Sequence, residues 1–466
     1  MERQGIAKSI SPIKTSFFDL YKIGPGPSSS HTIGPMKAAR DFLHRLQELD
    51  EAKVKKGTHI EAFLYGSLSA TGKGHGTDRA ILAGLRDWTP EQCDPDEFSN
   101  LLSSEGESYN IDVGSGHSIP FSAFNIHFQA ISHDFPFSNT IIMQLREESE
   151  RVLFEMEYYS VGGGFIQWKG YEEPELDNPP YPYQHMEQLR EWMEQEEGID
   201  LHDILLANEM TISGLAANEI KMRMDRVITT MEKAVERGIS TEGLLPGTIH
   251  LNRKAPAVYN RARYQAHSED RHLVYLNAYC LAASEENAAG NMVVTAPTSG
   301  ASGVMPGIIY LLLHHHHIER AKLRKGMMVA AAVGFLVKHN ASISGAEAGC
   351  MGEVGTAAAM GAALISYVHD CSIRCIEAAA EIAIEHHLGM TCDPVGGYVQ
   401  IPCIERNAVG GVKAYNAYLL ASSGVPENQK VSLDNVIDVM RETGKDMSKK
   451  YKETSQGGLA LSMTEC

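Results

Sequence analysis

The segment from Gly349 to Cys403 opens with Gly-Cys-Met-Gly-Glu-Val-Gly-Thr-Ala-Ala-Ala-Met-Gly (349–361) and closes with Met-Thr-Cys-Asp-Pro-Val-Gly-Gly-Tyr-Val-Gln-Ile-Pro-Cys (390–403). Its cysteines Cys350, Cys392 and Cys403 stand in or beside glycine- and proline-rich backbone, which can fold closely around an inorganic group. Between the two ends, apolar residues at helical spacing predict helices over 354–369 and 371–387. The segment therefore predicts a helical domain built around a candidate metal site.

The same helical character extends from residue 201 to the last residue. Alanine is abundant there, apolar residues recur at intervals of three and four, and clear strand patterns are missing. Further helices are expected over 204–236, 275–289, 303–314 and 325–339. We therefore predict a mostly α-helical C-terminal catalytic domain over residues 201–466, of the all-α class and ending in a C-terminal tail.

The first part of the chain interleaves strand and helix patterns. Strand alternation is present over 60–66, 125–128, 139–143 and 153–159, and residues 36–49 have helical spacing. Residues 167–200 are rich in Glu, Pro, Tyr and Gln, which indicates a linker. The expected N-terminal domain is therefore of the α+β class and covers residues 1–166.

Composition narrows the class of protein. The chain has 466 residues, of which 43% are hydrophobic and 21% charged, and its formal net charge is −18. An acidic chain lacks the basic surface that phosphate backbones require, so we expect no nucleic acid partner. The first residues contain no apolar stretch typical of a signal peptide, and the longest apolar runs are shorter than a membrane span. We therefore expect a cytoplasmic protein with no membrane partner.

Polar side chains gather in glycine-bearing loops. Residues 26–32, Gly-Pro-Ser-Ser-Ser-His-Thr, bring hydroxyls and His31 to a predicted helix N-terminus, which favours a carboxylate or a phosphate. Residues 72–78 place Lys73 and His75 among glycines. Residues 160–164 and 295–303 likewise combine hydroxyl side chains with glycines. Each loop also has a plain alternative, an ordinary capped helix start or a flexible turn.

The spacing of Cys350, Cys392 and Cys403 is a weak signal by itself, because it is too spread for a zinc knuckle or a compact ferredoxin motif. Buried structural cysteines are the plain alternative. An iron-sulfur cluster held by three cysteines keeps one iron without a protein ligand, and that iron is a Lewis acid able to bind a substrate hydroxyl. A dehydration at such a site also needs a base, for which histidine is suited.

Five segments together resemble the iron-sulfur-dependent L-serine dehydratases, or L-serine ammonia-lyases, although no single motif would be specific. These segments are 26–32, 72–78, 160–165, 296–300 and 392–397. The resemblance covers nearly the whole chain and implies the single-chain form in which the β and α domains are fused. It implies that the protein is a lyase that converts L-serine to pyruvate and ammonia with a 4Fe-4S cluster. For soluble enzymes the base rate favours a homodimer.

The resemblance also carries site residues onto this sequence. It implies that Cys350, Cys392 and Cys403 hold the cluster. His75, His31 and Lys73 are the catalytic candidates, and the resemblance does not decide which histidine is the base. The expected substrate-binding residues are Ser29, Ser30, Thr77, Asp78, Asn139, Ser160, Gly162, Gly163, Gly164, Thr298, Ser299 and Gly300.

Cys466, the last residue of the sequence, carries a sulfur and a free carboxylate, much as L-serine carries a hydroxyl and a carboxylate. Our hypothesis is that the tail folds into the active site and that Cys466 is a fourth ligand when substrate is absent. A frayed tail is the alternative. Two other functions remain open from the residues: a pyridoxal-phosphate lyase with Lys73 as Schiff base and 295–303 as phosphate loop, and a non-catalytic iron-sulfur sensor.

Overall fold

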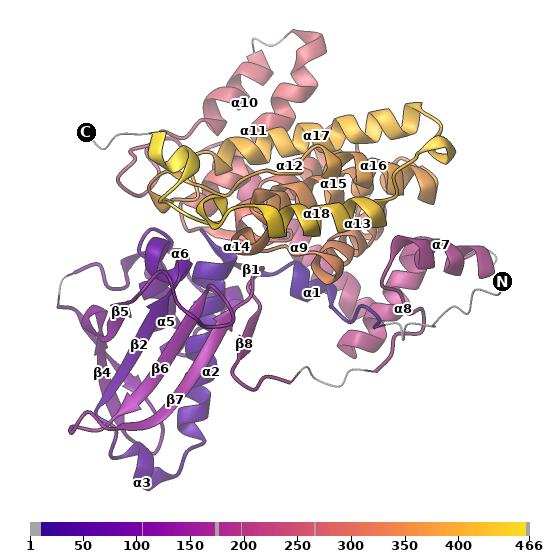
Figure 1. The fold of residues 1–466 in the computed structure, drawn as a ribbon. Helices are drawn as coiled ribbons and strands as arrows, with labels where there is room; N and C mark the ends of the chain where they lie inside the picture. The colour runs from indigo at the N-terminus through magenta and orange to yellow at the C-terminus, as the bar shows by residue number, and fades with distance from the viewer. Residues whose placement is uncertain (1–10, 105, 173–176, 197, 265–266, 463–466) are drawn as a thin grey trace.

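A five-stranded mixed sheet forms the core of the N-terminal domain (Figure 1). The computed structural model describes residues 11–104, 106–172, 177–196, 198–264 and 267–462, so Cys466 lies outside the described residues. In the sheet, β2 and β5 are parallel and all other neighbours are antiparallel. The strand order is β5 (Ile126–Phe128), β2 (His59–Tyr65), β6 (Thr140–Arg146), β7 (Val152–Ser160) and β8 (Ile166–Trp168).

Two helices cover one face of this sheet. α2 (Gly34–Gln47) and α5 (Thr77–Leu85) pack against each other, and α2 also contacts β6, β7 and β8. Residues of β2 alternate between buried and half-buried positions, as expected for a strand with one face on the core. The smaller elements here are α3 (Glu51–Val54), α4 (Ser67–Thr71), η2 (Pro90–Gln92), α6 (Pro95–Asn100), the hairpin β3 (Ser108–Asp112) and β4 (Ser118–Ser122), and η3 (Ala123–Asn125).

The C-terminal domain is a bundle around α15 (Thr356–Val368), which packs on α12, α13, α16 and α17. The segment Met351–Val368 is long and apolar enough to cross a membrane by length and composition, yet 89% of it is buried inside the protein. It is therefore the central core helix of this domain. The helices around it are α7 (Met186–Gln195), α8 (Leu201–Ser213), α9 (Ala217–Gly238), α10 (Ala255–Tyr264), α11 (Ser268–Ala288), α12 (Val304–His314), α13 (Arg320–Asn340), α14 (Gly345–Ala348), α16 (Ile373–Glu385), α17 (Cys403–Ser423) and α18 (Leu433–Asp446).

The first described residues pack with the helical domain before the chain enters the sheet. In α1 (Phe17–Leu20), Phe17 stacks on Phe335 of α13 with ring centroids 5.9 Å apart. β1 (Ile23–Pro25) then forms a short antiparallel pair with β9 (Met292–Val294). Residues before the sheet are thus part of the helical core.

The predicted fold class is confirmed: an α+β domain precedes a mostly helical one. Two details of the prediction are wrong. The helix expected over 204–236 is two helices, because Gly214 takes a left-handed conformation with φ of 69° and ends α8. The second domain also contains the strand β9, which is too short for its alternation to be seen in the sequence.

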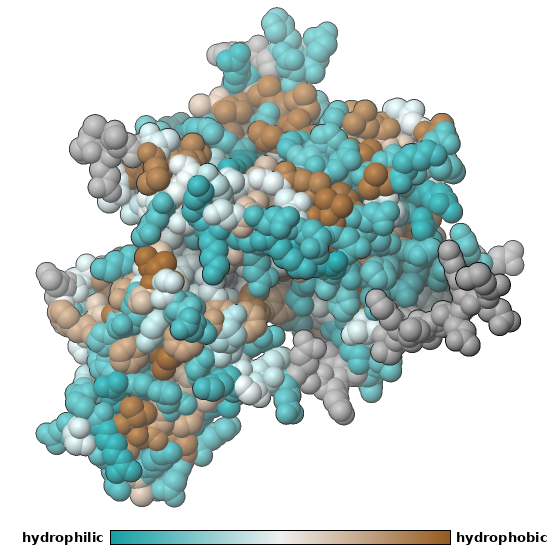
Figure 2. Space-filling view, viewed as in Figure 1, coloured by the Kyte–Doolittle hydropathy of each residue, from teal (hydrophilic) through white to brown (hydrophobic). Residues whose placement is uncertain are grey.

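The surface is mixed in character. On the face shown in Figure 2, hydrophilic side chains surround separate hydrophobic patches over both domains. Exposed apolar residues of the helical domain include Leu419 and Leu420 of α17. The described surface is therefore that of an acidic globular chain whose apolar residues are mostly internal, in agreement with its composition.

Candidate active site between the two domains

A buried turn joins the two domains at the start of α2. Residues 28–33, here called the serine turn, form one π-helical turn, η1 (Ser29–Ile33), capped by the Ser28 hydroxyl, which accepts from the His31 backbone N–H at 3.1 Å. The carbonyl before the turn, that of Pro27, accepts from the Asn287 side chain of α11 at 2.8 Å. The turn therefore rests on the helical domain while it opens a helix of the sheet domain.

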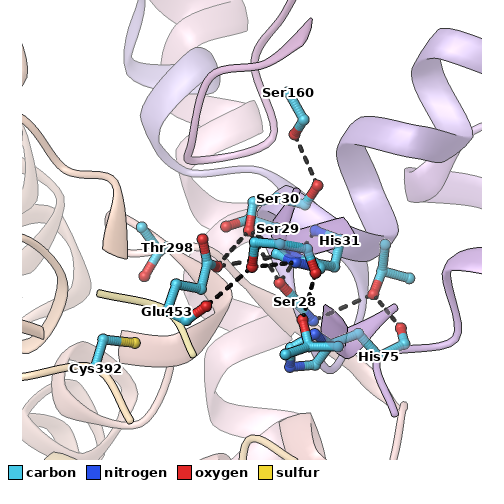
Figure 3. Close-up of polar contacts among 12 residues, drawn as sticks. Ser28, Ser29, Ser30, His31, His75, Ser160, Thr298, Cys392 and Glu453 are labelled. Carbon is cyan, nitrogen blue, oxygen red and sulfur yellow. Dashed lines mark hydrogen bonds and ion pairs between the residues drawn. The ribbon is translucent and has the colours of Figure 1, made fainter. Parts of the chain in front are cut away.

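The polar side chains of the serine turn form a closed chain of contacts (Figure 3). The Ser30 hydroxyl lies 2.8 Å from Nδ1 of His31 and 3.0 Å from Oε1 of Glu453. Nε2 of His31 lies 3.1 Å from the Ser67 hydroxyl, which donates to the backbone oxygen of Glu453 at 3.0 Å. Burial lowers the pKa of His31 to about 4, so its imidazole is neutral at neutral pH.

His75 lies beside this closed chain of contacts, but its side chain is not part of it. Its ring centroid is 4.6 Å from that of His31, and its backbone carbonyl accepts from the Thr32 hydroxyl at 2.8 Å. The side chain is buried, and within the described chain neither ring nitrogen has a hydrogen-bond partner. Burial, followed by the proximity of His31, lowers the pKa of His75. His75 is therefore a neutral imidazole with an uncommitted lone pair.

Two expected binding residues hold the backbone of the serine turn. The Thr77 hydroxyl donates to the His31 carbonyl at 2.6 Å, and the Ser160 hydroxyl donates to the Ser30 carbonyl at 2.7 Å. Both side chains are buried. Their contacts fix the position of His31 and leave their hydroxyls committed to the protein.

Lys73 and Asp78 lie apart from the serine turn. Lys73 is exposed, and its ammonium group is 5.4 Å from the centroid of the Phe128 ring. The Asp78 carboxylate accepts from the backbone N–H of Arg79. The structure thus brings His31 and His75 together and leaves the third catalytic candidate, Lys73, at the surface.

The three glycines after Ser160 allow the domains to approach closely. Gly162, Gly163 and Gly164 all have positive φ, of 93°, 56° and 73°. A Cβ on Gly162 would lie 2.9 Å from Cβ of Ser344, which belongs to the helical domain. A side chain here would therefore separate the two halves of the site.

The helical domain meets the serine turn through the loop at 298–300, which includes part of η4 (Ser299–Ala301). The Thr298 hydroxyl donates to Oε1 of Glu353 at 2.7 Å, and the Ser299 backbone N–H donates to the Ser29 hydroxyl at 3.3 Å. At Gly300, a Cβ would lie 2.9 Å from Oε1 of Glu353. These three expected binding residues thus lie between the hydroxyls of one domain and the cysteines of the other.

Several buried polar atoms at the expected site have no partner among the described residues. They include both ring nitrogens of His75, Oδ1 of Asn139 and the Ser299 hydroxyl. Buried polar atoms in folded proteins are nearly always hydrogen-bonded, to protein or to water. Their gathering at residues chosen from sequence motifs indicates a place for a polar ligand.

The three predicted cysteine ligands are buried on the helical side. Cys350 precedes η5 (Met351–Gly355), Cys392 lies in the loop before η6 (Val395–Gly397), and Cys403 is the first residue of α17. Ligand atoms of Cys350, Glu353 and Cys392 lie within 4.8 Å of one another. The neighbouring Cys350 thiol contributes to raised pKa values of both Cys392 and Cys403, together with burial. The three thiols therefore share one buried site.

These residues fit an iron-sulfur group. Thiolates are the ligands that iron-sulfur clusters use, and crowded buried thiolates need nearby positive charge. Gly345 lets the backbone approach these groups closely, since a Cβ there would lie 2.9 Å from Oε2 of Glu353 and 3.3 Å from Sγ of Cys392. The donor set and its burial agree with the expected cluster.

Sequence reasoning missed three charged residues at the site. Glu353 lies between the thiols, with Oε2 3.9 Å from Sγ of Cys350 and 3.8 Å from Sγ of Cys392. Arg406, one helical turn after Cys403, donates to the Thr391 carbonyl at 2.6 Å, and the nearby Cys350 thiol contributes to its raised pKa. The i, i+3 spacing from Cys403 was the available signal for Arg406.

The third missed residue, Glu453, arrives on a C-terminal strap, residues 449–462, which includes η8 (Lys449–Tyr451) and η9 (Gly458–Ser462). The Cys392 N–H donates to the Tyr451 carbonyl at 2.8 Å, and the Thr454 N–H donates to the Cys392 carbonyl at 3.1 Å. The strap thus runs along the Cys392 loop and carries the Glu453 carboxyl group into the serine turn.

Comparison with known proteins agrees with this two-part site. Residues 16–171 match the family model described as serine dehydratase beta chain, and residues 196–460 match the one described as serine dehydratase alpha chain. The chain belongs to the serine dehydratase family. It is therefore an enzyme of the lyase class, as the sequence predicted.

Curated relatives of this family match over nearly their whole length. A protein named L-serine dehydratase from Haemophilus influenzae is 41% identical, over 96% of this chain and 98% of its own. L-serine dehydratase 2 from Escherichia coli is 40% identical, over 97% and 99%, and L-serine dehydratase from Streptomyces coelicolor is 39% identical, over 97% and 99%. The resemblance predicted from motifs is confirmed.

Proposed function

We propose that this protein is an L-serine dehydratase that forms pyruvate and ammonia, with a 4Fe-4S cluster held by Cys350, Cys392 and Cys403. The observation that carries the proposal is the burial of these three thiols opposite the serine turn, which contains His31 and lies against His75. The names of the relatives support L-serine as the substrate. When bound, the cluster supplies a Lewis-acidic iron without a protein ligand that can bind the substrate hydroxyl.

We assign the base to His75. A base must be deprotonated and have a free lone pair, and His75 meets both conditions because it is neutral and its ring nitrogens are unpartnered in the described chain. Both nitrogens of His31 already contact hydroxyls. His75 removes the proton from Cα, and the electron pair of that C–H bond forms the Cα–Cβ double bond as the hydroxyl leaves. The resulting enamine gives pyruvate and ammonia after tautomerisation and hydrolysis.

The residues of both domains orient the substrate in this scheme. Asn139 and Ser299, whose buried oxygens have no partner among the described residues, provide polar contacts to the substrate. Glycines 162–164 bring the domains together, and Thr77 and Ser160 hold the backbone of the serine turn. Closure of the site between two domains excludes water from the reacting atoms.

The two alternative functions have less support. A pyridoxal-phosphate enzyme with Lys73 as Schiff base would need Lys73 near 295–303, but Lys73 is exposed beside Phe128. In the same loop, Thr298 donates to the Glu353 carboxyl group, which would repel a phosphate. A non-catalytic iron-sulfur sensor leaves the ring nitrogens of His75, which have no partner in the described part of the chain, without a role.

Anaerobic purification tests the proposal. The expected result is brown protein with about four iron and four sulfide per chain, which forms pyruvate from L-serine and loses activity in air. Cys371→Ser is the matched control, because Cys371 lies in the same domain and outside the thiol site. A yellow, air-stable protein without sulfide would instead support the pyridoxal-phosphate alternative, and a clustered protein with no turnover would support the sensor.

We retain the proposal that Cys466 occupies the open iron when substrate is absent. The strap supports it, because the Leu459 backbone N–H donates to the carboxylate of Asp393, the neighbour of Cys392, at 2.8 Å. The chain is thus held beside the thiol site seven residues before Cys466. If Cys466→Ser left both the cluster spectrum and the onset of turnover unchanged, this proposal would be wrong.

A further inference from the structure

Glu453 reaches the serine turn from the far end of the sequence. Its side chain is 12% exposed, and Oε1 lies 3.5 Å from Nδ1 of His31. The backbone at Glu453 has φ of 47°, an unfavourable value for a residue with a side chain. The Ser67 hydroxyl fixes this conformation through the Glu453 carbonyl. The strap therefore presents this carboxyl group to His31 at a conformational cost.

The hydroxyl of Ser30 contacts two groups that can both accept its hydrogen. It lies 3.0 Å from Oε1 of Glu453 and 2.8 Å from Nδ1 of His31, and a serine hydroxyl has one hydrogen to donate. If Glu453 were ionised and His31 neutral, the four contacts that link Ser30, His31, Ser67 and Glu453 would share only three hydrogens, so one contact would have none. A complete set of hydrogen bonds needs one additional proton in this chain of groups.

The opposite side of His31 limits where that proton can lie. The Ser67 hydroxyl donates its hydrogen to the Glu453 carbonyl, so it can only accept from Nε2 of His31. His31 therefore carries a hydrogen on Nε2. The additional proton is then either on Glu453, with Nδ1 of His31 accepting from Ser30, or on Nδ1 itself, with Glu453 ionised.

We propose that Glu453 and His31 share one proton through the Ser30 hydroxyl and that this proton resides on Glu453, which makes Glu453 a positioning residue that keeps His31 neutral and hydrogen-bonded on both nitrogens. His31 is then held in one tautomer and is not a base. The general base remains His75, whose nitrogens are free within the described chain. This inference rests on the proposed active site and adds a residue to it.

The surroundings favour the proton on the carboxyl group. Burial raises the pKa of Glu453 to about 7, although hydrogen bonds from Ser30 and Asn139 oppose the rise, and burial lowers the pKa of His31 to about 4. The other titratable groups facing the pair are His75, whose ring is next to His31, and Glu353 and the Cys392 thiol, which both interact electrostatically with Glu453. A second carboxylate nearby disfavours ionisation of Glu453.

Infrared difference spectra of the anaerobic holoenzyme between about pH 5 and about pH 9 test the inference directly. The wild type should show the carbonyl band of a neutral carboxylic acid that titrates near neutral pH. Subtracting the spectrum of Glu453→Gln isolates Glu453 from other buried carboxyl groups, including Glu353. Gln456→Ala, an exposed position on the same strap, is the control and should leave the band unchanged.

Ser30→Ala supplies an independent arm if Glu453→Gln does not fold. In the proposed arrangement the Ser30 hydroxyl accepts the Glu453 proton and donates to Nδ1 of His31, so its loss disfavours the protonated form and the midpoint of the band should fall by about 1 pH unit. In turnover, Glu453→Ala should lower kcat about 10- to 100-fold with a smaller change in KM, and Glu453→Gln, whose amide can donate to Ser30 as the protonated carboxyl group does, should recover most of the loss.

Two outcomes would overturn the inference: a wild-type spectrum with no neutral-acid band assignable to Glu453 at any pH, or a Ser30→Ala midpoint equal to that of the wild type. The spectra do not depend on turnover. If the infrared bands titrate as expected while L-serine yields no pyruvate, the proposed function is wrong and the inference of a shared proton is still supported.

Discussion

The helical side of the interdomain site carries three buried thiols, whereas the sheet side carries two buried histidines and a chain of hydroxyls. The thiols are crowded beside one carboxyl group and one guanidinium, and under the proposed function they acquire their full set of bonds only with a metal group. The serine turn, in contrast, has its hydrogen bonds in place already. In the proposed function, one side is completed by a cofactor, and the other is preorganised by the fold itself.

The largest expected effect comes from removing a thiol. Cys392→Ser should reduce bound iron and bring pyruvate formation to the assay background, because the remaining ligands no longer enclose the cluster. Iron analysis and the pyruvate assay on anaerobic protein check this. Full iron with full activity in Cys392→Ser would remove the basis of the contrast between the two sides.

A smaller loss of activity is expected from a substitution on the sheet side of the site. His75→Asn should lower kcat by about 10²- to 10⁴-fold, the usual contribution of a general base, with iron content unchanged. His127→Asn is the control, since His127 is in the same domain and pairs with Glu61 away from the site. A kcat within about twofold of wild type would move the base from His75 to another group.

A substitution of Arg406 tests how the helical side of the site retains its metal group. Arg406→Lys keeps the charge but not the fork of donors that reaches Thr391 and Asp393, so iron should be lost about 10- to 100-fold more readily to a chelator. The measurement is the chelator concentration that removes half the iron under anaerobic conditions. Equal retention in Arg406→Lys and wild type would show that charge alone is sufficient.

The smallest effect is expected at Lys73. Lys73→Met should leave kcat and KM within about twofold, because its ammonium group is at the surface beside Phe128. Steady-state kinetics with L-serine measure this. A loss of tenfold or more would return Lys73 to the catalytic residues and reopen the pyridoxal-phosphate alternative.

Much of the fold and part of the site were predictable from local sequence. Helical spacing indicated the bundle, alternation indicated β2, β6 and β7, and glycine-bearing motifs indicated both histidines. The cysteines stood out because their neighbours are glycine and proline. These signals are local, since each depends on residues a few positions apart.

The rest depends on contacts that no local pattern contains. Glu453 meets Ser30 across 423 positions of sequence, and nothing near Glu453 marks it as a site residue. Lys73 shows the reverse case, because a glycine-rich motif suggested catalysis while the backbone of that loop directs its side chain to Phe128. Tertiary packing decides both outcomes.

The position of Phe17 against Phe335 has a consequence for biosynthesis. The N-terminal residues leave the ribosome first, yet their place in the helical core exists only after α13 has been made. The sheet domain can therefore fold early. The residues before it cannot reach their final packing against α13 until about 300 further residues have been synthesised. A ribosome-bound chain stalled before α13 should expose this segment to chaperones and proteases, and a chain stalled after α13 should protect it.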